Sequence, residues 1–548
     1  MSNLLIENSL YTFITKFSKW FKYLLIPVNL GLIGFIIYVA DKGIDLTDEG
    51  LYLMYANPEQ EINSFMTYNL LFKPLFFLFN LKFSIFALRV LRLLLLIIAA
   101  LNLFRTISKT YFEGKIGSLF NYMLVILTVF PTYLFGPQTI SYNSISLIFS
   151  LFATSEIIQL TKSPTNKSVI IKLSLTLCII YLAKFTTPLL LIGLTSILYV
   201  YQYWKTKEKE YVKGGIFFIL SLIISFNIMF LIFPETNISS ILGSITGAHN
   251  KSHSFSDMLI SWSIGLTKVT PFLFLGYFGG KILDSKSRYN SFFYALFTLV
   301  IFVNIYIWNW QFESIKIRFS MFVFFLLGTV FHGFSKRFSN EKIILLVVLI
   351  FSPFAVYFGT NNPPLVYLKT VITFFLILVI IFENRVFKQG IVLFLFCGLL
   401  AYEMRGEIIR KPHRQFPLTS CTEVIEYNGS EHFVAPQTKQ LISDLNKVFE
   451  RSPLQSDYLF SVSRLLGEVA LTGKKFPSNP LWSFKELKTW SEKNHTLPDT
   501  FFLITNHKEP NKVLTHFDKL NVKYLNTVKK QKYNGQSEDI ACYVISKK

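Results

Sequence analysis

Apolar runs separated by short polar segments fill most of this 548-residue chain. The first run, at 23–40, holds 18 residues without a charge. As a helix it would extend about 27 Å, close to the thickness of the hydrocarbon core of a bilayer. Twelve further runs follow at 86–104, 116–135, 142–160, 169–183, 186–203, 212–233, 259–279, 291–308, 317–334, 342–358, 366–383 and 390–403. The pattern predicts a polytopic α-helical membrane protein with about 13 spans.

The segments between these runs differ in charge. Lys16, Lys19 and Lys22 precede the first run, and four acidic residues follow it between 41 and 49. Every second later loop is basic, and of the intervening loops only 309–318 has comparable positive charge. Because Lys and Arg are enriched on the cytoplasmic side, we expect a cytoplasmic N-terminus and a multi-pass protein of the plasma (inner) membrane.

The stretch at 65–83 is also apolar, but it contains Lys73 and Pro74. Counting it as a span would place every later basic loop outside. We therefore predict a helix that lies at the membrane interface.

The composition changes after about residue 405, where no run long enough to cross a bilayer remains. An odd number of spans places this part outside, facing the periplasm or exterior. Patterns typical of helices (437–450 and 512–520) and of buried strands (457–463, 499–505 and 539–546) alternate along it. We expect a transmembrane domain at 1–404, with an external loop at 41–85, and an extracytoplasmic α/β domain at 405–548.

Composition supports a membrane protein. Hydrophobic residues make up 52% of the chain and charged residues 16%, against about 25% charged in soluble proteins. The net charge of +21 would suggest nucleic acid in a soluble protein. Here much of the Lys and Arg lies between apolar runs, so we expect the bilayer, and no nucleic acid, as the partner.

Acidic residues concentrate just outside the first run, in DLTDEGLY at 45–52. Vicinal carboxylates suit an enzyme, because one can accept a proton from an acceptor hydroxyl while its neighbour raises its pKa or helps to hold a metal. The alternative is a solvated acidic loop that enforces topology. Asp48 and Glu49 are the candidate catalytic residues.

The order of these features resembles the GT-C superfamily of polyprenyl-phosphate-dependent glycosyltransferases. Its members include the protein O-mannosyltransferases, the lipid A aminoarabinose transferase and the oligosaccharyltransferases. Segments 89–107, 181–193 and 465–480 also resemble parts of these proteins. The resemblance implies a GT-C-like fold and a catalytic acid in the first external loop, where Asp48-Glu49 is the matching pair. Asp45 is a weaker match, and we place it with Tyr52 among the candidate sugar-binding residues.

The second external loop departs from the family pattern. Several of these families place a second acidic residue there, whereas FGPQTISYN at 135–143 has none. The departure favours a single base without an obligatory cation, and leaves a divalent cation as an option. Gln138, Tyr142 and Asn143 are either candidate ligands of sugar hydroxyls or polar caps of a helix.

Three basic residues are candidates for binding the phosphate of a lipid donor. Lys184 lies between two apolar runs, where an ionisable side chain is costly and suggests function, although it could also snorkel to the interface. Lys316 and Arg318 share an external loop with Trp310, an aromatic residue suited to an interface belt or to sugar stacking. Arg318 is preferred because a guanidinium can bind phosphate through two hydrogen bonds.

The remaining candidates are two histidines and two cysteines. His249 and His253 have a spacing that suits a metal only on a helix, which Gly247 and its polar neighbours disfavour. We expect a polar loop over the substrate or an idle loop, and no metal site. Cys421 and Cys542 are the only cysteines of the external domain, whose compartment permits a disulfide between them.

The main hypothesis is a hexosyl- or pentosyltransferase that passes a sugar from a polyprenyl phosphate or diphosphate to a glycan, lipid or protein outside. Asp48 would act as general base, with inversion at the anomeric carbon. A flippase or transporter for lipid-linked sugars is one alternative, but it predicts charges deep inside several spans. An O-antigen ligase or polymerase is another, but those rest on a large central external loop.

Overall fold

The computed structural model describes residues 23–60, 67–135, 138–236, 255–285, 289–308, 315–337, 340–358, 364–388, 390–410, 416–462, 465–476, 498–506, 520–531 and 536–547. Most of these residues are helical. The helices are Tyr23–Val39, α2 (Asp48–Ala56), α3 (Lys73–Phe79), α4 (Ile85–Phe112), α5 (Leu119–Leu134), α6 (Tyr142–Leu160), α7 (Lys167–Ala183), α8 (Thr186–Thr206), α9 (Lys209–Ile232), α11 (Phe255–Leu283), α12 (Asn290–Trp308), α13 (Ile315–Arg337), α14 (Asn340–Tyr357), α15 (Pro364–Phe382), α16 (Arg385–Lys388), α17 (Gly390–Met404), α18 (Pro436–Glu450) and α19 (Leu466–Leu471).

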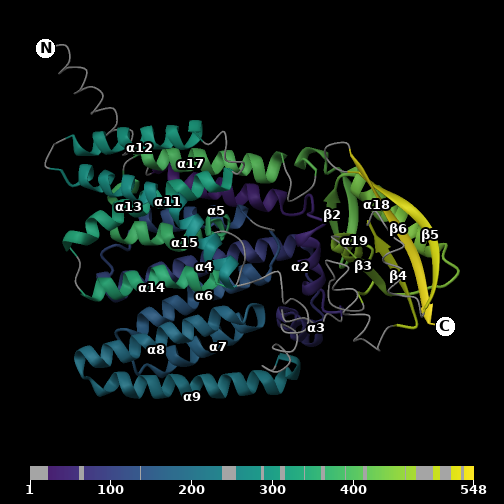
Figure 1. The fold of residues 1–548 in the computed structure, drawn as a ribbon, viewed down its shortest axis with the longest axis horizontal. Helices are drawn as coiled ribbons and strands as arrows, with labels where there is room; N and C mark the ends of the chain where they lie inside the picture. Colours follow the sequence, from purple (N-terminus) through teal and green to yellow (C-terminus); the bar gives the residue numbers. More distant parts are fainter. Residues whose placement is uncertain are drawn as a thin grey trace, which may run out of the picture.

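The long helices run side by side in one bundle, and the C-terminal strands lie at one end of it (Figure 1). A helix forms at each of the apolar runs predicted from the sequence. Among the described residues, four helices are long and apolar enough to cross a membrane, namely Ile85–Phe112, Tyr142–Leu160, Lys209–Ile232 and Leu259–Leu283. Several others are apolar but shorter.

Contacts between loops test the predicted sidedness without reference to a membrane. Lys162 forms an ion pair with Glu341 at 2.6 Å, and both belong to loops predicted as cytoplasmic. Lys184 Nζ donates to the carbonyl of Val356 at 2.7 Å, at the end predicted as external. Each of these two contacts therefore joins segments that the sequence predicts to lie on the same side. Which end faces the cytoplasm stays a prediction.

The stretch at 65–83 does not form a long helix in its described part. The short 3₁₀ helix Tyr68–Leu71 precedes α3, which ends at Phe79. Seven residues of helix extend only about 10 Å, so α3 cannot cross a bilayer. Phe77 and Phe79 are exposed, as an interfacial helix requires.

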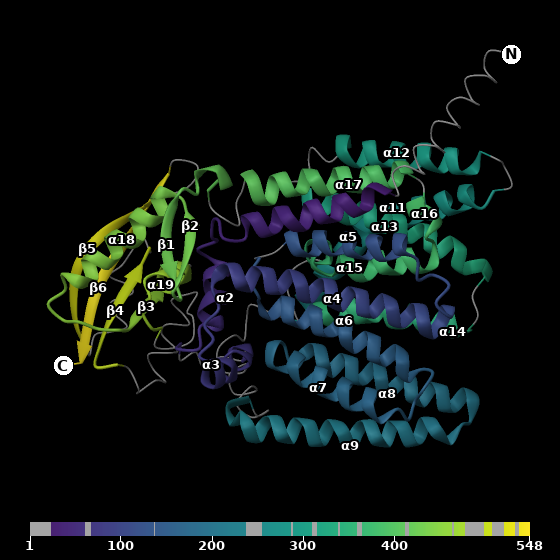
Figure 2. The same ribbon diagram turned by 180° about the vertical axis from the view of Figure 1, so that it is seen from behind.

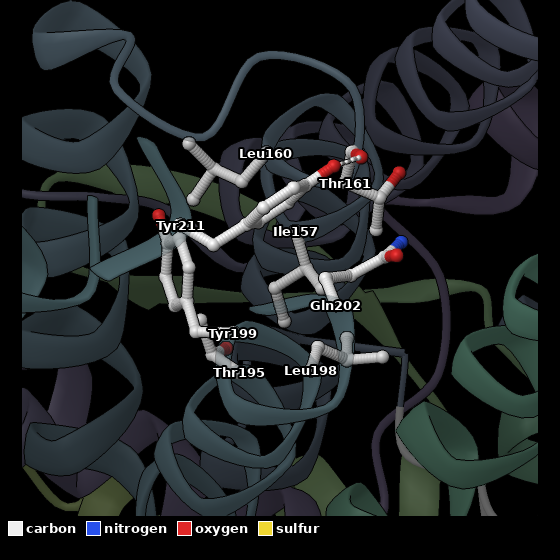
Figure 3. Close-up of a pocket in the computed structure, with 8 residues that line it drawn as sticks. All are labelled: Ile157, Leu160, Thr161, Thr195, Leu198, Tyr199, Gln202 and Tyr211. Atoms are coloured by element: carbon white, nitrogen blue, oxygen red, sulfur yellow. Dashed lines mark hydrogen bonds between the residues drawn. The ribbon is translucent and has the colours of Figure 1, made fainter. Parts of the chain in front are cut away.

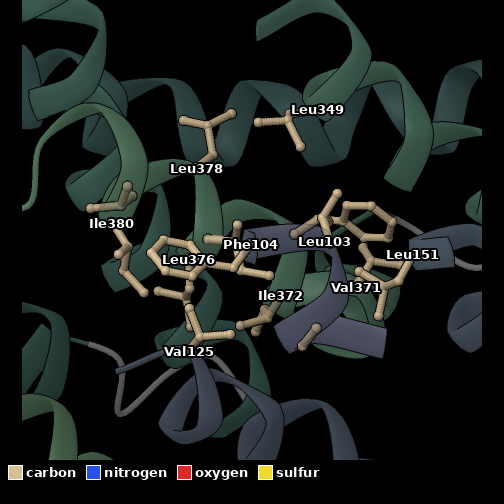
Figure 4. Close-up of a cluster of buried hydrophobic side chains, with 14 of the residues drawn as sticks. Leu103, Phe104, Val125, Leu151, Leu349, Val371, Ile372, Leu376, Leu378 and Ile380 are labelled. Atoms are coloured by element: carbon tan, nitrogen blue, oxygen red, sulfur yellow. The ribbon is translucent and has the colours of Figure 1, made fainter. Parts of the chain in front are cut away.

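The hydrophobic core of the bundle is built around α15, which packs against α5, α13 and α14. Figure 4 shows Val371, Ile372 and Leu376 of α15 beside side chains of neighbouring helices. Every one of these three residues is at most 1% exposed. An all-round apolar helix of this kind is typical of a buried segment.

The C-terminal part contains two sheets. The strands β1 (Glu423–Tyr427) and β2 (Ser430–Val434) form an antiparallel hairpin. The second sheet has the order β3-β4-β6-β5, made of β3 (Leu459–Val462), β4 (Thr500–Thr505), β5 (Leu520–Gln531) and β6 (Ser537–Lys547). β3 and β4 are parallel, and the other pairs are antiparallel. The predicted α/β composition is confirmed, as are α18, β3, β4 and β6.

Other parts of this domain differ from the prediction. β5 and the β1–β2 hairpin were not predicted. The helix predicted at 512–520 falls on residues that the structure does not describe, except for Leu520, which begins β5. The structure does not contain the predicted disulfide, since Cys421 and Cys542 are both buried and are not bonded to each other. Cys421 precedes the hairpin, whereas Cys542 lies on the inner strand β6, opposite Ile504 and Asn526. Cys421 therefore lies outside both sheets, whereas Cys542 is part of the second one.

Candidate active site

The acidic segment forms the junction between the two parts of the molecule. α2 begins at Asp48 and lies between the bundle and the C-terminal domain, as the two opposite views show (Figures 1 and 2). Asp48 is exposed at the N-terminus of α2, while Asp45 and Glu49 are buried. A helix N-terminus stabilises negative charge, so the first turn of α2 is a favourable place for the carboxylates of Asp48 and Glu49.

Glu49 forms a buried ion pair with Arg89 of α4. Arg89 Nε donates to Glu49 Oε1 at 3.0 Å, and Nη2 donates to Oε2 at 2.7 Å. The two side chains are 0% and 2% exposed. The other donors of Arg89 bind the carbonyls of Ala40 (2.9 Å), Lys42 (3.0 Å) and Gly43 (2.7 Å). All five N–H groups of the guanidinium are therefore used.

This ion pair changes the role expected for Glu49. A general base needs an oxygen that an acceptor hydroxyl can reach. Both oxygens of Glu49 are instead bound to Arg89, and Oε2 also accepts from the backbone N–H of Asp45 at 3.1 Å. In this structure Glu49 holds the segment in place, and its predicted catalytic role stays a prediction.

Asp45 is held by its own turn. The hydroxyl and the backbone N–H of Thr47 donate to Asp45 Oδ1 at 2.6 and 2.9 Å. Burial raises the pKa of the Asp45 carboxyl from its usual 3.8 to about 6, and the nearby carboxylates of Glu49 and Asp48 act in the same direction. Asp45 therefore titrates close to neutral pH, which is a property of functional carboxyls as well as of buried structural ones.

Aromatic side chains lie next to the acidic segment. The ring of Tyr52 on α2 packs edge-to-face against Tyr142 at 6.0 Å between centroids. Tyr142 is the first residue of α6, whose N-terminus Ser141 and Ser144 cap with reciprocal hydrogen bonds. The structure thus brings Tyr52 and the start of α6 together. Gln138 is buried just before this helix, and Asn143 is its second residue.

The candidate phosphate ligands lie on two other elements. Lys184 follows α7, and its ammonium group donates to the carbonyl of Val356. Arg318 lies in the first turn of α13 and is partly buried. Lys316 belongs to the same turn, and its side chain lies outside the described residues, as do Trp310, His249 and His253. In the described part of the chain, neither Lys184 nor Arg318 forms an ion pair with Asp48.

The described residues contain no group of three or more His, Cys, Asp or Glu side chains that could hold a metal ion. A small cavity of about 10 Å³ lies between α6, α8 and the start of α9 (Figure 3). That volume is about what one water molecule requires. Its lining residue Leu160 ends α6, whereas Tyr142 at the other end of that helix contacts α2. The cavity is therefore remote from the acidic segment.

Sequence reasoning missed the residue that organises the site. Arg89 and Arg92 lie three residues apart in an otherwise apolar run. Charged residues inside such a run are costly and indicate a buried partner, so this spacing was the available signal. Arg92 lies over the ring of Tyr133 at 5.0 Å and donates to the carbonyl of Thr132 at 3.3 Å.

Comparisons with known protein families and with curated proteins find no match. Among solved structures, the chain is similar to the crystal structure of ArnT from Cupriavidus metallidurans bound to undecaprenyl phosphate. The similarity covers 95% of this chain and 97% of that chain, with a TM-score of 0.41 and 10% sequence identity.

Proposed function

We propose that this protein is an integral-membrane glycosyltransferase of the GT-C type, which moves a sugar from a polyprenyl phosphate or diphosphate to a hydroxyl of a glycan, lipid or protein. The observation that carries the proposal is the arrangement of the three acidic residues. Asp48 is exposed at the start of α2, while the buried pair Glu49–Arg89 fixes the helix that bears it. An exposed carboxylate on a rigid support is what proton abstraction requires.

In the proposed reaction, Asp48 accepts the proton of the acceptor hydroxyl as its oxygen attacks the anomeric carbon. The bond from that carbon to the phosphate oxygen breaks, and the lipid phosphate leaves with the electron pair. A single displacement inverts the configuration at the anomeric carbon. Tyr142, which is partly exposed and packs against Tyr52 of Asp48's helix, offers a face on which a sugar ring can stack.

The leaving phosphate needs positive charge to stabilise it. Arg318 and Lys184 are the proposed ligands. Lys184 lies between α7 and α8, next to Ala183, which packs in the same hydrophobic cluster as α2. Arg318 lies in the first turn of α13, next to Phe319, which contacts Phe135 just after α5. Lys184 uses one donor on Val356, and an ammonium group has three. We propose that these cations suffice and that no divalent metal is required, which activity in excess chelator tests.

The proposed topology follows from the same site. Polyprenyl-linked donors serve reactions outside the cytoplasm, where no nucleotide sugar is available. We therefore place α2 and the C-terminal domain on the periplasmic or external side of the plasma membrane, with the N-terminus inside. Labelling of a cysteine introduced at Lys447, an exposed position of α18, by a membrane-impermeant reagent on intact cells tests this orientation.

The function is tested with the full-length protein reconstituted in liposomes that contain polyprenyl-phosphate sugars. The expected result is release of polyprenyl phosphate in step with glycosylation of an added acceptor. Movement of the donor between leaflets without phosphate release would contradict the proposal and favour a flippase. Transfer of only long preassembled chains would favour an O-antigen ligase or polymerase.

A further inference from the structure

The acidic segment is held as much by the C-terminal domain as by the membrane helices. β2 binds its start, since Gly43 N–H donates to the carbonyl of Phe433 at 2.7 Å and Phe433 N–H donates to that of Asp41 at 2.8 Å. His432 Nε2 donates to the carbonyl of Gly43 at 3.0 Å. Gly43 has a φ of 63°, a conformation that glycine adopts without strain.

Two further contacts hold α2 and the residues after it. The hydroxyl of Tyr427 on β1 donates to the carbonyl of Leu53 at 2.9 Å. The side chain of Gln60 donates to the carbonyl of Lys474 at 3.1 Å and accepts from the N–H of Phe476 at 2.8 Å. The segment at 41–60 is therefore bound by the C-terminal domain along its whole length.

The closest approach is between α19 and α2. Gly467 N–H donates to the carbonyl of Leu46 at 2.9 Å. A Cβ added to Gly50 would fall on the backbone of Gly467, and a Cβ added to Gly467 would fall on the backbone of Leu46. The two backbones are thus in direct contact, and a side chain larger than hydrogen at either position must push them apart.

The other face of α19 is fixed to the second sheet. Glu468 Oε1 pairs with Lys530 Nζ of β5 at 2.5 Å, and the two side chains are 0% and 7% exposed. Because breaking a buried pair leaves an uncompensated charge, α19 cannot easily shift relative to its sheet. A displacement at Gly467 is therefore passed to α2, which is the element that bears Asp48.

We propose that Gly467 is a positioning residue for the transfer reaction: by docking α19 directly on α2, it sets the place of Asp48 relative to the donor. The C-terminal domain is then part of the catalytic unit, although none of its residues touches the reacting atoms. This inference rests on the proposed function.

The test compares Gly467→Ala with Gly398→Ala in the full-length protein. A Cβ at Gly398, in α17, meets nothing within 4 Å, so this variant is the matched control. The Cβ at Gly467 must displace the backbone of Leu46, two residues before α2, by roughly 1 Å to reach van der Waals contact. A misplacement of that size, passed on to α2, can lower kcat on the order of 100-fold. The KM for the lipid donor should stay within about twofold, because the proposed phosphate ligands lie on other elements.

Hydrogen–deuterium exchange of the amides at 45–56 supplies the second readout. We expect faster exchange there in Gly467→Ala and no change in Gly398→Ala. If wild-type protein transfers sugar and Gly467→Ala keeps the wild-type kcat, the inference is wrong. If wild-type protein transfers no sugar, the proposed function fails instead, and the exchange data still report on the docking.

A milder variant keeps the test decisive if Gly467→Ala does not fold: Tyr427→Phe removes only the hydroxyl that binds Leu53. It should lower kcat severalfold at unchanged donor KM. A Tyr427→Phe protein with wild-type kcat would likewise overturn the positioning role of the domain.

Discussion

Substitution of Glu49 separates a structural from a catalytic role of this residue. In Glu49→Gln the shape of the side chain is kept, but the negative charge that faces Arg89 is lost and an amide N–H₂ must point toward one of its donors. Arg89 is fully buried, so the uncompensated guanidinium has no access to water. Breaking a buried ion pair in this way costs about 3–5 kcal/mol.

We expect this cost to appear as lower stability of the purified full-length protein in detergent, with the midpoint of thermal unfolding reduced by a few degrees. Glu210→Gln is the control, because it removes the same charge from the exposed pair Lys213–Glu210, whose side chains are 62% and 52% exposed. Exposed ion pairs contribute little to stability, so this variant should have the same melting temperature as the wild type. Arg89→Lys keeps a positive charge but offers three donors in place of five, and should also be destabilised.

The result that refutes this reasoning is a Glu49→Gln protein that melts within experimental error of the wild type. If that protein had also lost turnover, Glu49 would be a catalytic residue. The site that acts on substrate would then have a structure without the buried Glu49–Arg89 pair.

Further predictions concern Asp45 and the two proposed phosphate ligands. Asp45→Asn should stabilise the protein at neutral pH: the folded pKa lies above the unfolded value of 3.8, so the contribution of Asp45 to stability is full below pH 3.8 and is lost as pH rises through about 6. This loss of folding stability corresponds to up to about 3 kcal/mol. The melting curves of the variant and the wild type should converge at pH 4. Equal melting temperatures at pH 7 would contradict the prediction. Arg318→Lys should weaken binding of polyprenyl phosphate about tenfold or more by removing the bidentate geometry, and Lys184→Ala should do so by removing a charge. Normal donor affinity of both, measured by isothermal titration in detergent, would place the phosphate elsewhere.

The fold was predictable where burial follows local composition. The apolar runs predict the helices because a bilayer or a protein core imposes the same demand on every residue of the run. β3, β4 and β6 could be predicted from their apolar sequences for a related reason. All residues of β3 are buried, and so are all but the first residue of β4. β5 was missed because it is an edge strand, largely exposed and rich in Lys toward its end, with no buried run to mark it.

The site was predictable only in part. The acidic segment could be found from its position beside the first run, and Tyr52 and Tyr142, two of the predicted sugar-binding residues, pack together in the structure. The different roles of Asp45, Asp48 and Glu49 could not be predicted, because they depend on Arg89, which is 40 residues away from Glu49 in the sequence. The contact between α2 and α19 is set by two glycines more than 400 residues apart, for which no local pattern exists.

The most direct test of the central claim is the turnover of Asp48→Asn. The amide keeps the shape of the carboxylate and cannot take the proton, so kcat should fall by about 10²–10⁴-fold. Donor binding and the melting temperature should match those of the wild type, since Asp48 is exposed. Asp444→Asn, the same substitution in α18 of the C-terminal domain, should keep full activity. Wild-type turnover by the Asp48→Asn protein would contradict the account.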